Sequence, residues 1–265
     1  MTFKKYQLSE PVERALEALA YHTPTEVQRL VIPQALEGKD CVVRSQTGSG
    51  KTAAFAIPIV EQIDWLENRP QVLVLTPTRE LAVQVAEEFT VIGRYKRVKA
   101  VALYGKQPFR YQQTELKQKT HVVVGTPGRV LDHLTRGTLK LDKLHTVVID
   151  EADEMLNMGF IEEVEKILRF VENKHATMLF SATMPKRVLE LADKHTINAT
   201  HIEVVTEGET TATIEHFKIT IKDDGKQQLL QDLVVVENPD SCIIFCRTKD
   251  RVDAVHDALY ELEYS

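Results

Sequence analysis

The sequence lacks the features that would place it in a membrane or outside the cell. No uninterrupted apolar run approaches the ~20 residues that a helix needs to cross a bilayer. Lys4 and Lys5 near the N-terminus are not followed by the apolar segment of a secretory signal. The overall content, 43% hydrophobic and 27% charged residues, is ordinary for a globular protein. We therefore expect a cytoplasmic protein with no membrane partner.

Cysteine is scarce, which excludes a disulfide framework. The chain has three cysteines, Cys41, Cys242 and Cys246, and two of them lie in apolar runs typical of strands. This usage predicts buried thiols that pack in a core in a reducing compartment. Cys242 and Cys246 are four residues apart on an expected strand and the nine histidines are scattered, so the spacing of a zinc site is missing. No transition metal is predicted.

An excess of positive charge is also lacking, since the formal net charge is −6. A whole-chain sum cannot locate a local basic surface, so nucleic-acid binding stays open at this point. The one basic run, residues 94–99, has two interpretations: a nucleic-acid patch or a solvated connection between a helix and a strand. We favour the connection, because charge runs are usually solvated.

Short apolar runs alternate with segments of helical periodicity, which predicts an α/β fold with a parallel sheet flanked by helices. The expected strands cover residues 40–44, 72–75, 99–104, 121–125, 146–150, 177–181 and 201–205. The expected helices cover residues 53–66, 80–92, 129–134, 161–171 and 186–195. A first domain of residues 1–205 follows from this pattern.

A polar, threonine-rich stretch at residues 206–214 has little to bury and is expected to be a linker. Beyond it, residues 215–265 give the pattern of the start of a second sheet. Strands are expected at 216–221 and 242–245, and helices at 226–236 and 249–262. Such a fragment is smaller than a usual α/β domain, so we expect an incomplete second domain.

A glycine-rich stretch follows the expected strand at 40–44 and precedes a helix. It comprises Ser45, Gln46, Thr47, Gly48, Ser49, Gly50, Lys51 and Thr52. This context is the one that a phosphate-binding loop requires, although Ser45 stands where such loops usually have their first glycine. Backbone N–H groups attract phosphate oxygens, Lys51 can reach the outer phosphates, and the Thr52 hydroxyl can bind magnesium.

A tetrad of residues, 150–153, comes directly after the apolar run at 146–149 and carries acids at Asp150, Glu151 and Asp153. Alone, this tetrad could be an acidic helix N-terminus. Together with a phosphate-binding loop it predicts an ATPase, because parallel strands deliver such carboxylates to the rim where ligands bind. Asp150 would hold magnesium through water, and Glu151 would position or polarise the attacking water.

Seven segments in order resemble the motifs of the DEAD-box RNA helicases, over nearly the whole chain. They are residues 20–28, 45–52, 77–82, 126–129, 150–153, 181–183 and 243–249. Residues 105–106 and 153–160 look most like the bacterial ribosomal-RNA-directed (DbpA-type) subgroup. The resemblance implies a RecA-like domain at 1–205, an incomplete second RecA-like domain at 215–265, and ATP and Mg2+ as cofactors.

The residues expected to read adenine are Gln28, Tyr21 and Phe3. The amide of Gln28 has a donor and an acceptor that match the N6 and N7 edge of adenine. Tyr21 offers a stacking face, and the resemblance implies that Phe3 adds a second. Ala20 departs from the glycine usual in the family. In isolation Gln28 would be interpreted as a surface amide.

Two further segments, Pro77-Thr78-Arg79 and Thr126-Pro127-Gly128-Arg129, could be no more than strand-to-helix turns. That interpretation leaves both arginines unexplained, whereas two helix N-termini with arginines suit a sugar-phosphate backbone. The resemblance implies RNA there, and at Gly105, where the family often has two glycines.

The same resemblance makes Ser181 and Thr183, with Asp153, the residues that couple nucleotide state to unwinding. We therefore expect an ATP-dependent RNA helicase that acts as a monomer on RNA, and the resemblance implies ribosomal RNA as the target class. Two alternatives stay open. The chain could be a truncated nucleotide- and RNA-binding module, because the family's arginine finger lies in motifs that would follow Ser265. It could also be a DNA-directed ATPase of the wider helicase superfamily.

Overall fold

The computed structural model describes residues 2–172, 175–204, 215, 217–221 and 225–260. The chain divides into two compact units, Met1–Glu207 and Gly208–Ser265, and each is described by itself. The stretch 206–214, expected as a linker, lies outside the described residues.

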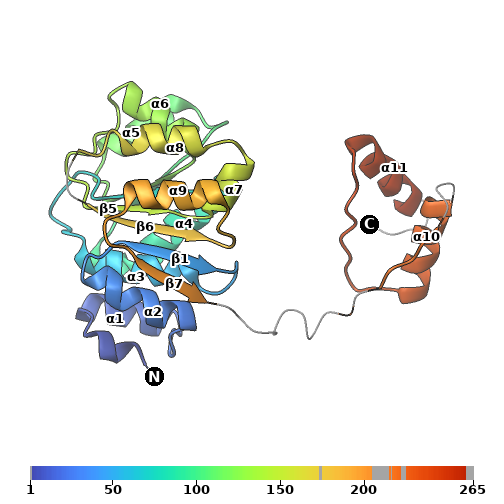
Figure 1. Ribbon diagram of the computed structural model, residues 1–265, viewed down its shortest axis with the longest axis horizontal. Helices are drawn as coiled ribbons and strands as arrows, with labels where there is room; N and C mark the ends of the chain where they lie inside the picture. The colour runs from blue at the N-terminus through green and yellow to red at the C-terminus, as the bar shows by residue number, and fades with distance from the viewer. Residues whose placement is uncertain (1, 173–174, 205–214, 216, 222–224, 261–265) are drawn as a thin grey trace. The chain divides into compact units, whose positions relative to one another are not determined.

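The first unit is built on a seven-stranded sheet in the order β3-β4-β2-β5-β6-β1-β7, in which the paired strands are parallel (Figure 1). The strands are β1 (Cys41–Ser45), β2 (Val72–Leu75), β3 (Ala100–Leu103), β4 (Val122–Gly125), β5 (Thr146–Ile149), β6 (Ala176–Ser181) and β7 (Thr200–Val204). Every residue of β2, β4 and β5 is buried. Continuous apolar strands of this kind are typical of a parallel sheet covered on both faces, as the sequence predicts.

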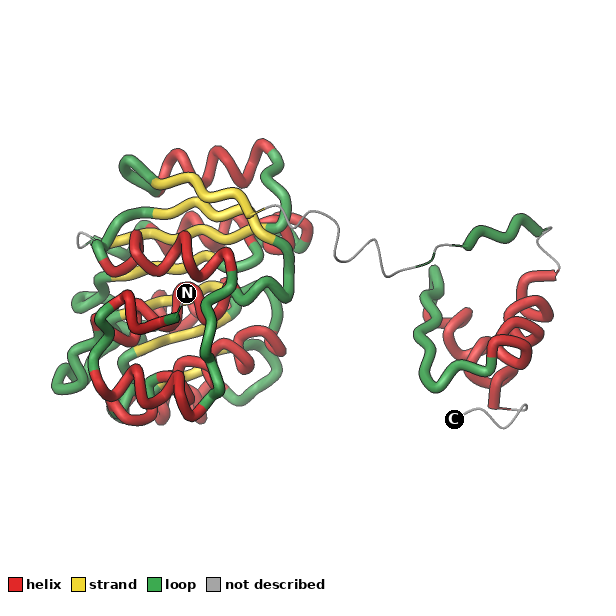
Figure 2. The backbone as a smooth tube through the Cα atoms, turned by 90° about the horizontal axis from the view of Figure 1, so that it is seen from below, coloured by secondary structure: helices red, strands yellow, loops and turns green. Residues whose placement is uncertain are grey.

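Helices cover both faces of this sheet, and Figure 2 shows the strands between them. One core cluster contains residues of α1 (Glu10–Ala18), α2 (Glu26–Leu36), α3 (Lys51–Gln62) and α4 (Arg79–Ile92). The other contains residues of α6 (Pro127–Thr135), α7 (Ala152–Asn157), α8 (Ile161–Leu168) and α9 (Lys186–His195). The short helices η1 (Phe3–Tyr6) and η2 (Arg94–Lys96) and the polar helix α5 (Phe109–Lys117) complete the unit.

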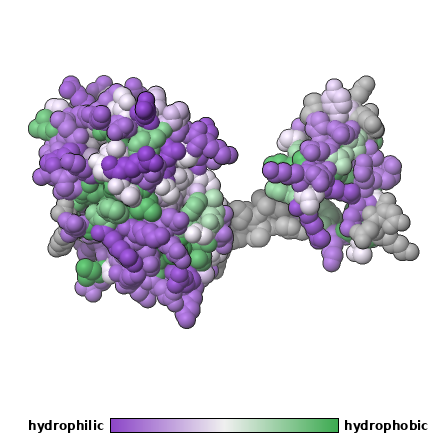
Figure 3. Space-filling view, turned by 90° about the horizontal axis from the view of Figure 1, so that it is seen from above, coloured by the Kyte–Doolittle hydropathy of each residue, from purple (hydrophilic) through white to green (hydrophobic). Residues whose placement is uncertain are grey.

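The surface of this unit is mixed. Hydrophilic side chains cover much of the face seen in Figure 3, with apolar side chains gathered in smaller areas. Among the described residues, no helix has both the length and the apolar character needed to cross a membrane. Cys41 is buried in the core, as predicted for the cysteines.

The second unit has two helices, α10 (Lys226–Glu237) and α11 (Lys249–Tyr260), at the positions expected for helices. Gln231 Nε2 donates a hydrogen bond of 2.9 Å to the carbonyl of Ala258, and Val234 and Val255 are buried. This contact holds the two helices together.

The sequence predicts two strands in the second unit, and for the residues that the structure describes this prediction is wrong. Residues 217–221 and 242–245 form no strand, and Phe245 is 93% exposed. Cys242 is exposed as well, so its predicted place in a core is also wrong. An apolar alternation becomes a strand only when a neighbouring strand satisfies its backbone N–H and C=O groups. Within the described residues of this unit no strand supplies them.

Candidate nucleotide and RNA sites

The glycine-rich loop joins β1 to the start of α3, as predicted. Gly48 and Gly50 have φ angles of +78° and +90°, in the left-handed region that favours glycine. A Cβ atom at Gly50 would also lie 2.7 Å from Gln28 Nε2. Gly50 is therefore required both by its backbone conformation and by the close approach of Gln28.

Lys51 and Ser45 lie at the base of this loop. The ammonium group of Lys51 donates a hydrogen bond of 3.2 Å to the carbonyl of Ser45, and its side chain is buried. The Ser45 hydroxyl is 2.6 Å from the Ser49 hydroxyl. Ser45, which departs from the usual glycine, is thus accommodated by a hydrogen bond within the loop. Thr47 and Thr52 line the cleft beside it, and the Gln46 carbonyl accepts from the Ser49 hydroxyl at 2.8 Å.

Gln28 connects the start of α2 to the loop. Its Oε1 accepts from the backbone N–H of Thr25 at 2.9 Å, and the two residues form a capping box. Its Nε2 donates to the carbonyl of Gly50 at 3.2 Å. A primary amide has two N–H donors and two acceptor lone pairs, so one of each is left after these bonds. The amide is therefore oriented by the protein and still able to read an adenine edge.

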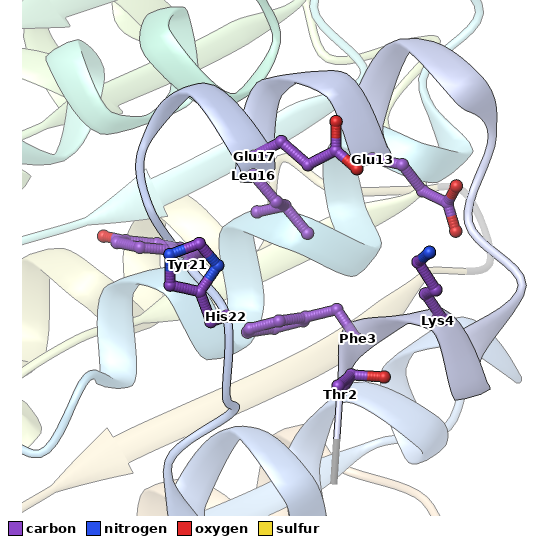
Figure 4. Close-up of a pocket in the computed structure, with 8 residues that line it drawn as sticks. All are labelled: Thr2, Phe3, Lys4, Glu13, Leu16, Glu17, Tyr21 and His22. Carbon is purple, nitrogen blue, oxygen red and sulfur yellow. The ribbon is translucent and has the colours of Figure 1, made fainter.

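The aromatic pair expected from the sequence is present. The rings of Phe3 and Tyr21 are stacked, with centroids 6.5 Å apart and planes inclined by 21°. Figure 4 shows Phe3 in a pocket with Tyr21 and His22 on one side and Lys4 on the other. Tyr21 also lines the cleft over the glycine-rich loop. An aromatic ring thus adjoins the glycine-rich loop, an arrangement that suits a purine nucleotide.

The two acids of the tetrad enter the same cleft. Asp150 follows β5 directly, and Asp150 and Glu151 line the cleft with Lys51 and Thr52. Asp150 is 2% exposed, and its Oδ1 accepts from the Glu151 N–H at 3.0 Å. Burial raises the pKa of Asp150 to about 6, although the positive charge of Lys51 opposes this shift.

Glu151 adopts a left-handed backbone conformation, with φ 53° and ψ 52°, at the start of α7. This region costs a residue with a Cβ atom ~1 kcal/mol or more, and such strain tends to occur at functional sites. The conformation ends β5 abruptly and places the tetrad at the rim of the sheet.

The residues present fit a magnesium ion. Oxygen ligands from one carboxylate and one hydroxyl, completed by phosphate and water, are the set that Mg2+ prefers, and Asp150 and Thr52 share one cleft. A cation there would also offset the burial of the Asp150 carboxylate. Among the described residues no cluster of three or more His, Cys, Asp or Glu side chains forms a metal site.

Asp153 links the tetrad to the turn after β6. The Ser181 hydroxyl accepts from the Asp153 N–H at 3.1 Å and donates to the Thr183 carbonyl at 2.6 Å. Thr183 donates to Asp153 Oδ2 from its N–H at 2.9 Å and from its hydroxyl at 2.8 Å. The three residues expected to couple the nucleotide site to unwinding thus form one network.

The segments expected to bind RNA follow three neighbouring strands at one rim of the sheet. Pro77, Thr78 and Arg79 follow β2, Gly105 follows β3, and Thr126, Pro127, Gly128 and Arg129 follow β4. The Thr78 hydroxyl caps α4 by accepting from Leu81 N–H at 3.2 Å. The guanidinium of Arg79 lies 5.1 Å from the ring centroid of Tyr104. Arg79, Gly105 and Gly128 are exposed, so this rim is open to a ligand.

Arg129 is held differently from Arg79. It is half-buried, and its Nη1 donates to the carbonyl of Gln107 and to Oε1 of Gln112, both at 2.9 Å. Part of its hydrogen-bonding capacity therefore serves the protein. The remaining guanidinium N–H groups are the ones that a phosphate could bind.

Gln112 of α5 is the centre of this arrangement and was not expected from the sequence. Its Nε2 donates to the carbonyl of Tyr104 at 2.9 Å and to Gln107 Oε1, and its Oε1 also contacts His133 Nε2 at 3.2 Å. Burial, followed by the charge of Arg129, lowers the pKa of His133 to about 4, so His133 is neutral. An isolated glutamine in a polar helix gives no signal in the sequence, because such amides usually lie on the surface.

Comparison with protein families now gives the deciding observation: residues 25–191 match the model of the DEAD/DEAH box helicases. The chain belongs to this family.

Among DEAD/DEAH box relatives, the chain is 58% identical over 262 residues to "ATP-dependent RNA helicase DbpA" of Bacillus subtilis (strain 168), covering 99% of this chain and 55% of the relative. It is 43% identical over 258 residues to "DEAD-box ATP-dependent RNA helicase CshA" of Bacillus cereus (strain ATCC 10987 / NRS 248), covering 97% and 49%. The chain therefore spans about half the length of these curated relatives.

Solved structures agree with this membership. The structure of a DEAD box protein from the hyperthermophile Methanococcus jannaschii matches with a TM-score of 0.74 and 36% identity, covering 100% of this chain and 71% of that one. A hypothetical ATP-dependent RNA helicase from Sulfolobus tokodaii matches with a TM-score of 0.71 and 39% identity, covering 94% and 71%. The RecA-like fold expected for the first domain is thus confirmed.

The DEAD/DEAH box cleft includes one helix face that was missed. Leu81, Gln84 and Glu88 of α4 line it, and Glu88 Oε1 accepts from the Tyr21 hydroxyl at 3.0 Å. Burial, followed by the charge of Glu88, raises the pKa of Tyr21 to about 12. These residues are spaced i, i+3 and i+7, and residues with this spacing share one face of a helix. This spacing could have been used to predict that they lie together in the cleft.

Proposed function

We propose that this chain is the ATP-binding part of an ATP-dependent RNA helicase, which hydrolyses ATP when RNA is bound and uses the cycle to open short RNA duplexes. One observation carries the proposal: Lys51, Thr52, Asp150 and Glu151 line a single cleft, and the tetrad to which both acids belong is hydrogen bonded to the turn after β6. A site for phosphoryl transfer and an element that can report its state are thus joined.

In this proposal each residue of the cleft has its own role. Lys51 neutralises the outer phosphates, and the N–H groups of the glycine-rich loop hold their oxygens. Thr52 directly and Asp150 through water would hold magnesium, which supplies charge stabilisation to the transferring phosphoryl group. Glu151 positions the attacking water and accepts its proton. Gln28, with Phe3 and Tyr21, selects adenine.

RNA is the second ligand that we propose. The turns after β2, β3 and β4 are exposed at Arg79, Gly105 and Gly128, whereas Pro77 and Pro127 are buried. The exposed positions and the N-termini of α4 and α6 along one rim suit a sugar-phosphate backbone read with little sequence preference. The resemblance to the DbpA-type subgroup makes ribosomal RNA, in ribosome assembly, the first target to test. We also propose that the protein acts as a cytoplasmic monomer.

Steady-state ATP hydrolysis by the 265-residue chain, with RNA, with single-stranded DNA and without nucleic acid, tests the proposal. RNA-specific stimulation supports an RNA helicase. Equal stimulation by both nucleic acids would favour a DNA-directed ATPase of the wider superfamily.

A second candidate is a module that binds ATP and RNA but turns over slowly. It is favoured by the lining of the cleft, in which Lys51 is the one cation among the described residues. Phosphoryl transfer gains about 10³ to 10⁵ in rate when an arginine approaches from the far side. Binding of both ligands without RNA-stimulated turnover would favour the module.

A further inference from the structure

Cations and aromatic rings gather at the opposite rim of the sheet from the candidate RNA segments. We call this group the basic–aromatic cluster and define it by two rings and the four cations stacked on them. Its members are Trp65, Tyr95, Arg14, Arg94, Arg97 and Lys119. It includes Arg94, Tyr95 and Arg97 of the basic run at 94–99, which we interpreted from the sequence as a solvated connection.

Each ring is shared by two cations. The guanidinium groups of Arg14 and Arg94 lie 4.3 Å and 5.1 Å from the centroid of Tyr95. Around Trp65, the Arg97 guanidinium lies at 5.5 Å and the Lys119 ammonium at 5.0 Å. Like charges repel, so gathering four of them around two rings is unfavourable unless the rings or a ligand compensate.

The cluster is continuous across the segments before β2, β3 and β4. The Trp65 carbonyl is 3.3 Å from His121 Nε2, and His121 Nδ1 accepts from the Lys99 N–H at 2.9 Å. Lys96 Nζ donates to the carbonyl of Glu61, four residues before Trp65. These bonds fix the backbone segments that present Arg97 and Lys119, so both cations belong to one surface.

The charges of these cations are not paired with carboxylates among the described residues. Within the part of the chain that the structure describes, none of the four stacked cations forms a salt bridge. The nearby acids have other partners: Glu61 accepts from the N–H and hydroxyl of Ser9, both at 2.9 Å, and Asp64 accepts from Leu66 N–H at 2.9 Å. Other exposed cations of this unit, such as Arg44 and Arg136, do pair with acids.

Stacking prepares an arginine to bind phosphate. A guanidinium that rests its flat face on a ring keeps its in-plane N–H donors free, and these match the geometry of phosphate oxygens. Several such cations in a row with interleaved aromatic rings are the pattern of a surface that binds a nucleic-acid strand.

We infer that the basic–aromatic cluster is a second RNA-binding surface, which contacts the phosphates of an RNA that already occupies the candidate site at the opposite rim. This inference rests on the proposed function. The strands β2, β3 and β4 each have four residues, so the two rims are separated by roughly one strand length, ~13 Å, plus the loops. A long RNA can reach both rims, whereas a short one is held at the first alone.

The test compares the binding of a long and a short single-stranded RNA, ~25 and ~6 nucleotides, to the 265-residue chain and its variant Arg97→Gln/Lys119→Gln. We expect affinity for the long RNA to fall ~5- to 10-fold. The slope of log affinity against log salt concentration should become shallower by ~1.4, the value for two lost phosphate contacts to a single strand. Affinity for the short RNA, and the ATP hydrolysis that it stimulates, should be unchanged. Arg14→Gln/Arg94→Gln should act in the same direction.

The control is Lys166→Gln/Arg169→Gln, which removes the same two residue types from exposed positions on or next to α8. Its affinity for the long RNA should match that of the original chain, and thermal unfolding should show all variants folded. Equal long-RNA affinity in the cluster variants and the original chain would refute the inference, and so would an equal loss in the control. If the cluster variants lose binding to anionic vesicles but keep their affinity for the long RNA, the cluster is a membrane-binding surface and the inference is refuted. Failure of the original chain to bind even the short RNA would instead refute the proposed function.

Discussion

One carboxylate oxygen of Asp153 accepts two hydrogen bonds from Thr183, from the backbone N–H at 2.9 Å and from the hydroxyl at 2.8 Å. Burial raises the pKa of Asp153, but the bonds from Thr183 and Ser181 outweigh it, so the pKa lies below its usual value. The tetrad next to the nucleotide cleft is thereby tied to the turn after β6. We propose that a shift of α7 would reach that turn through these bonds.

The first prediction concerns this contact. Thr183→Val keeps the shape of the side chain but removes the hydroxyl that binds Asp153, while the backbone bond survives. We expect ATP hydrolysis to stay within ~3-fold and duplex opening per ATP to fall ~10-fold, the effect of ~1 kcal/mol or more of lost hydrogen bonding. Phosphate release and strand displacement, measured on the same samples, check this. Thr183→Ser restores the hydroxyl, and a defect of equal size in this variant would contradict the assignment.

The second prediction concerns Lys51, whose ammonium group is buried beside Ser45 and the acids of the cleft. Lys51→Ala should lower ATP turnover at least ~100-fold, because a preorganised charge at the transferring group is lost. The fold should persist, since the change removes one hydrogen bond and little core. Turnover and circular dichroism measure the two effects, with exposed Lys39→Ala as the control. Turnover that survives Lys51→Ala would overturn the site assignment.

The third prediction follows from the buried carboxylate of Asp150. Its folded-state pKa of about 6 exceeds the usual value of 3.8, so the folded protein binds more protons than the unfolded chain between these two pH values. The contribution of Asp150 to stability is therefore lost as pH rises through this window. Asp150→Asn should raise the free energy of unfolding by ~1 to 3 kcal/mol at pH 7.5 while abolishing ATP hydrolysis. The gain should vanish below pH ~4, where Asp150 is neutral in both states.

Thermal unfolding of both proteins across pH, without nucleotide or magnesium, measures this gain. A variant that is no more stable than the original chain at pH 7.5 would show that burial does not penalise the carboxylate. The sign also implies that magnesium binds the nucleotide-free cleft more weakly as pH falls through about 6, because a proton competes with the cation for Asp150.

The fourth prediction separates the two roles of Gln28. Gln28→Glu keeps an oxygen acceptor for the Thr25 N–H, and glutamate is as good as glutamine in a capping box. It removes the Nε2 donor to Gly50 and to an adenine N7. Preference for ATP over GTP should therefore fall ~10-fold or more. The new carboxylate is buried and faces the Gly50 carbonyl, so it should lower stability at pH 7.5 more than at pH ~4, where it is largely neutral. Gln28→Ala should lose both discrimination and stability. Competition binding and thermal unfolding report the two effects, and an unchanged preference in Gln28→Glu would exclude adenine reading by this amide.

Much of the secondary structure of the first unit could be predicted, because it is encoded by local patterns of apolar residues. The apolar runs of β2 and β5 and the helical periodicity of α9 gave boundaries within a residue of those observed. Strand order was beyond reach, since β2 lies between β4 and β5 through contacts that no single stretch of sequence encodes. The T-x-x-Q signature at Thr25 and Gln28 marks the start of α2 and could have been used to predict that helix.

Two failures have a common physical cause. The amide of Gln112 acquires its importance from four partners on other segments, and residues 217–221 and 242–245 lack a neighbouring strand among the described residues. Hydrogen bonds between distant segments decide both cases. Patterns along the chain report burial and periodicity, but they do not report which distant group satisfies a polar atom.

Gln112 has both of its N–H donors and both of its carbonyl lone pairs in use. Arg129 and the carbonyl of Tyr104 are therefore ordered when the chain folds. When a ligand binds side chains that are already ordered, those side chains lose little rotamer entropy on binding. The residence time of the ligand then depends on contacts that are already in place. If RNA binds this rim as we propose, the time that it stays bound is thus partly decided by a buried glutamine that the RNA does not touch.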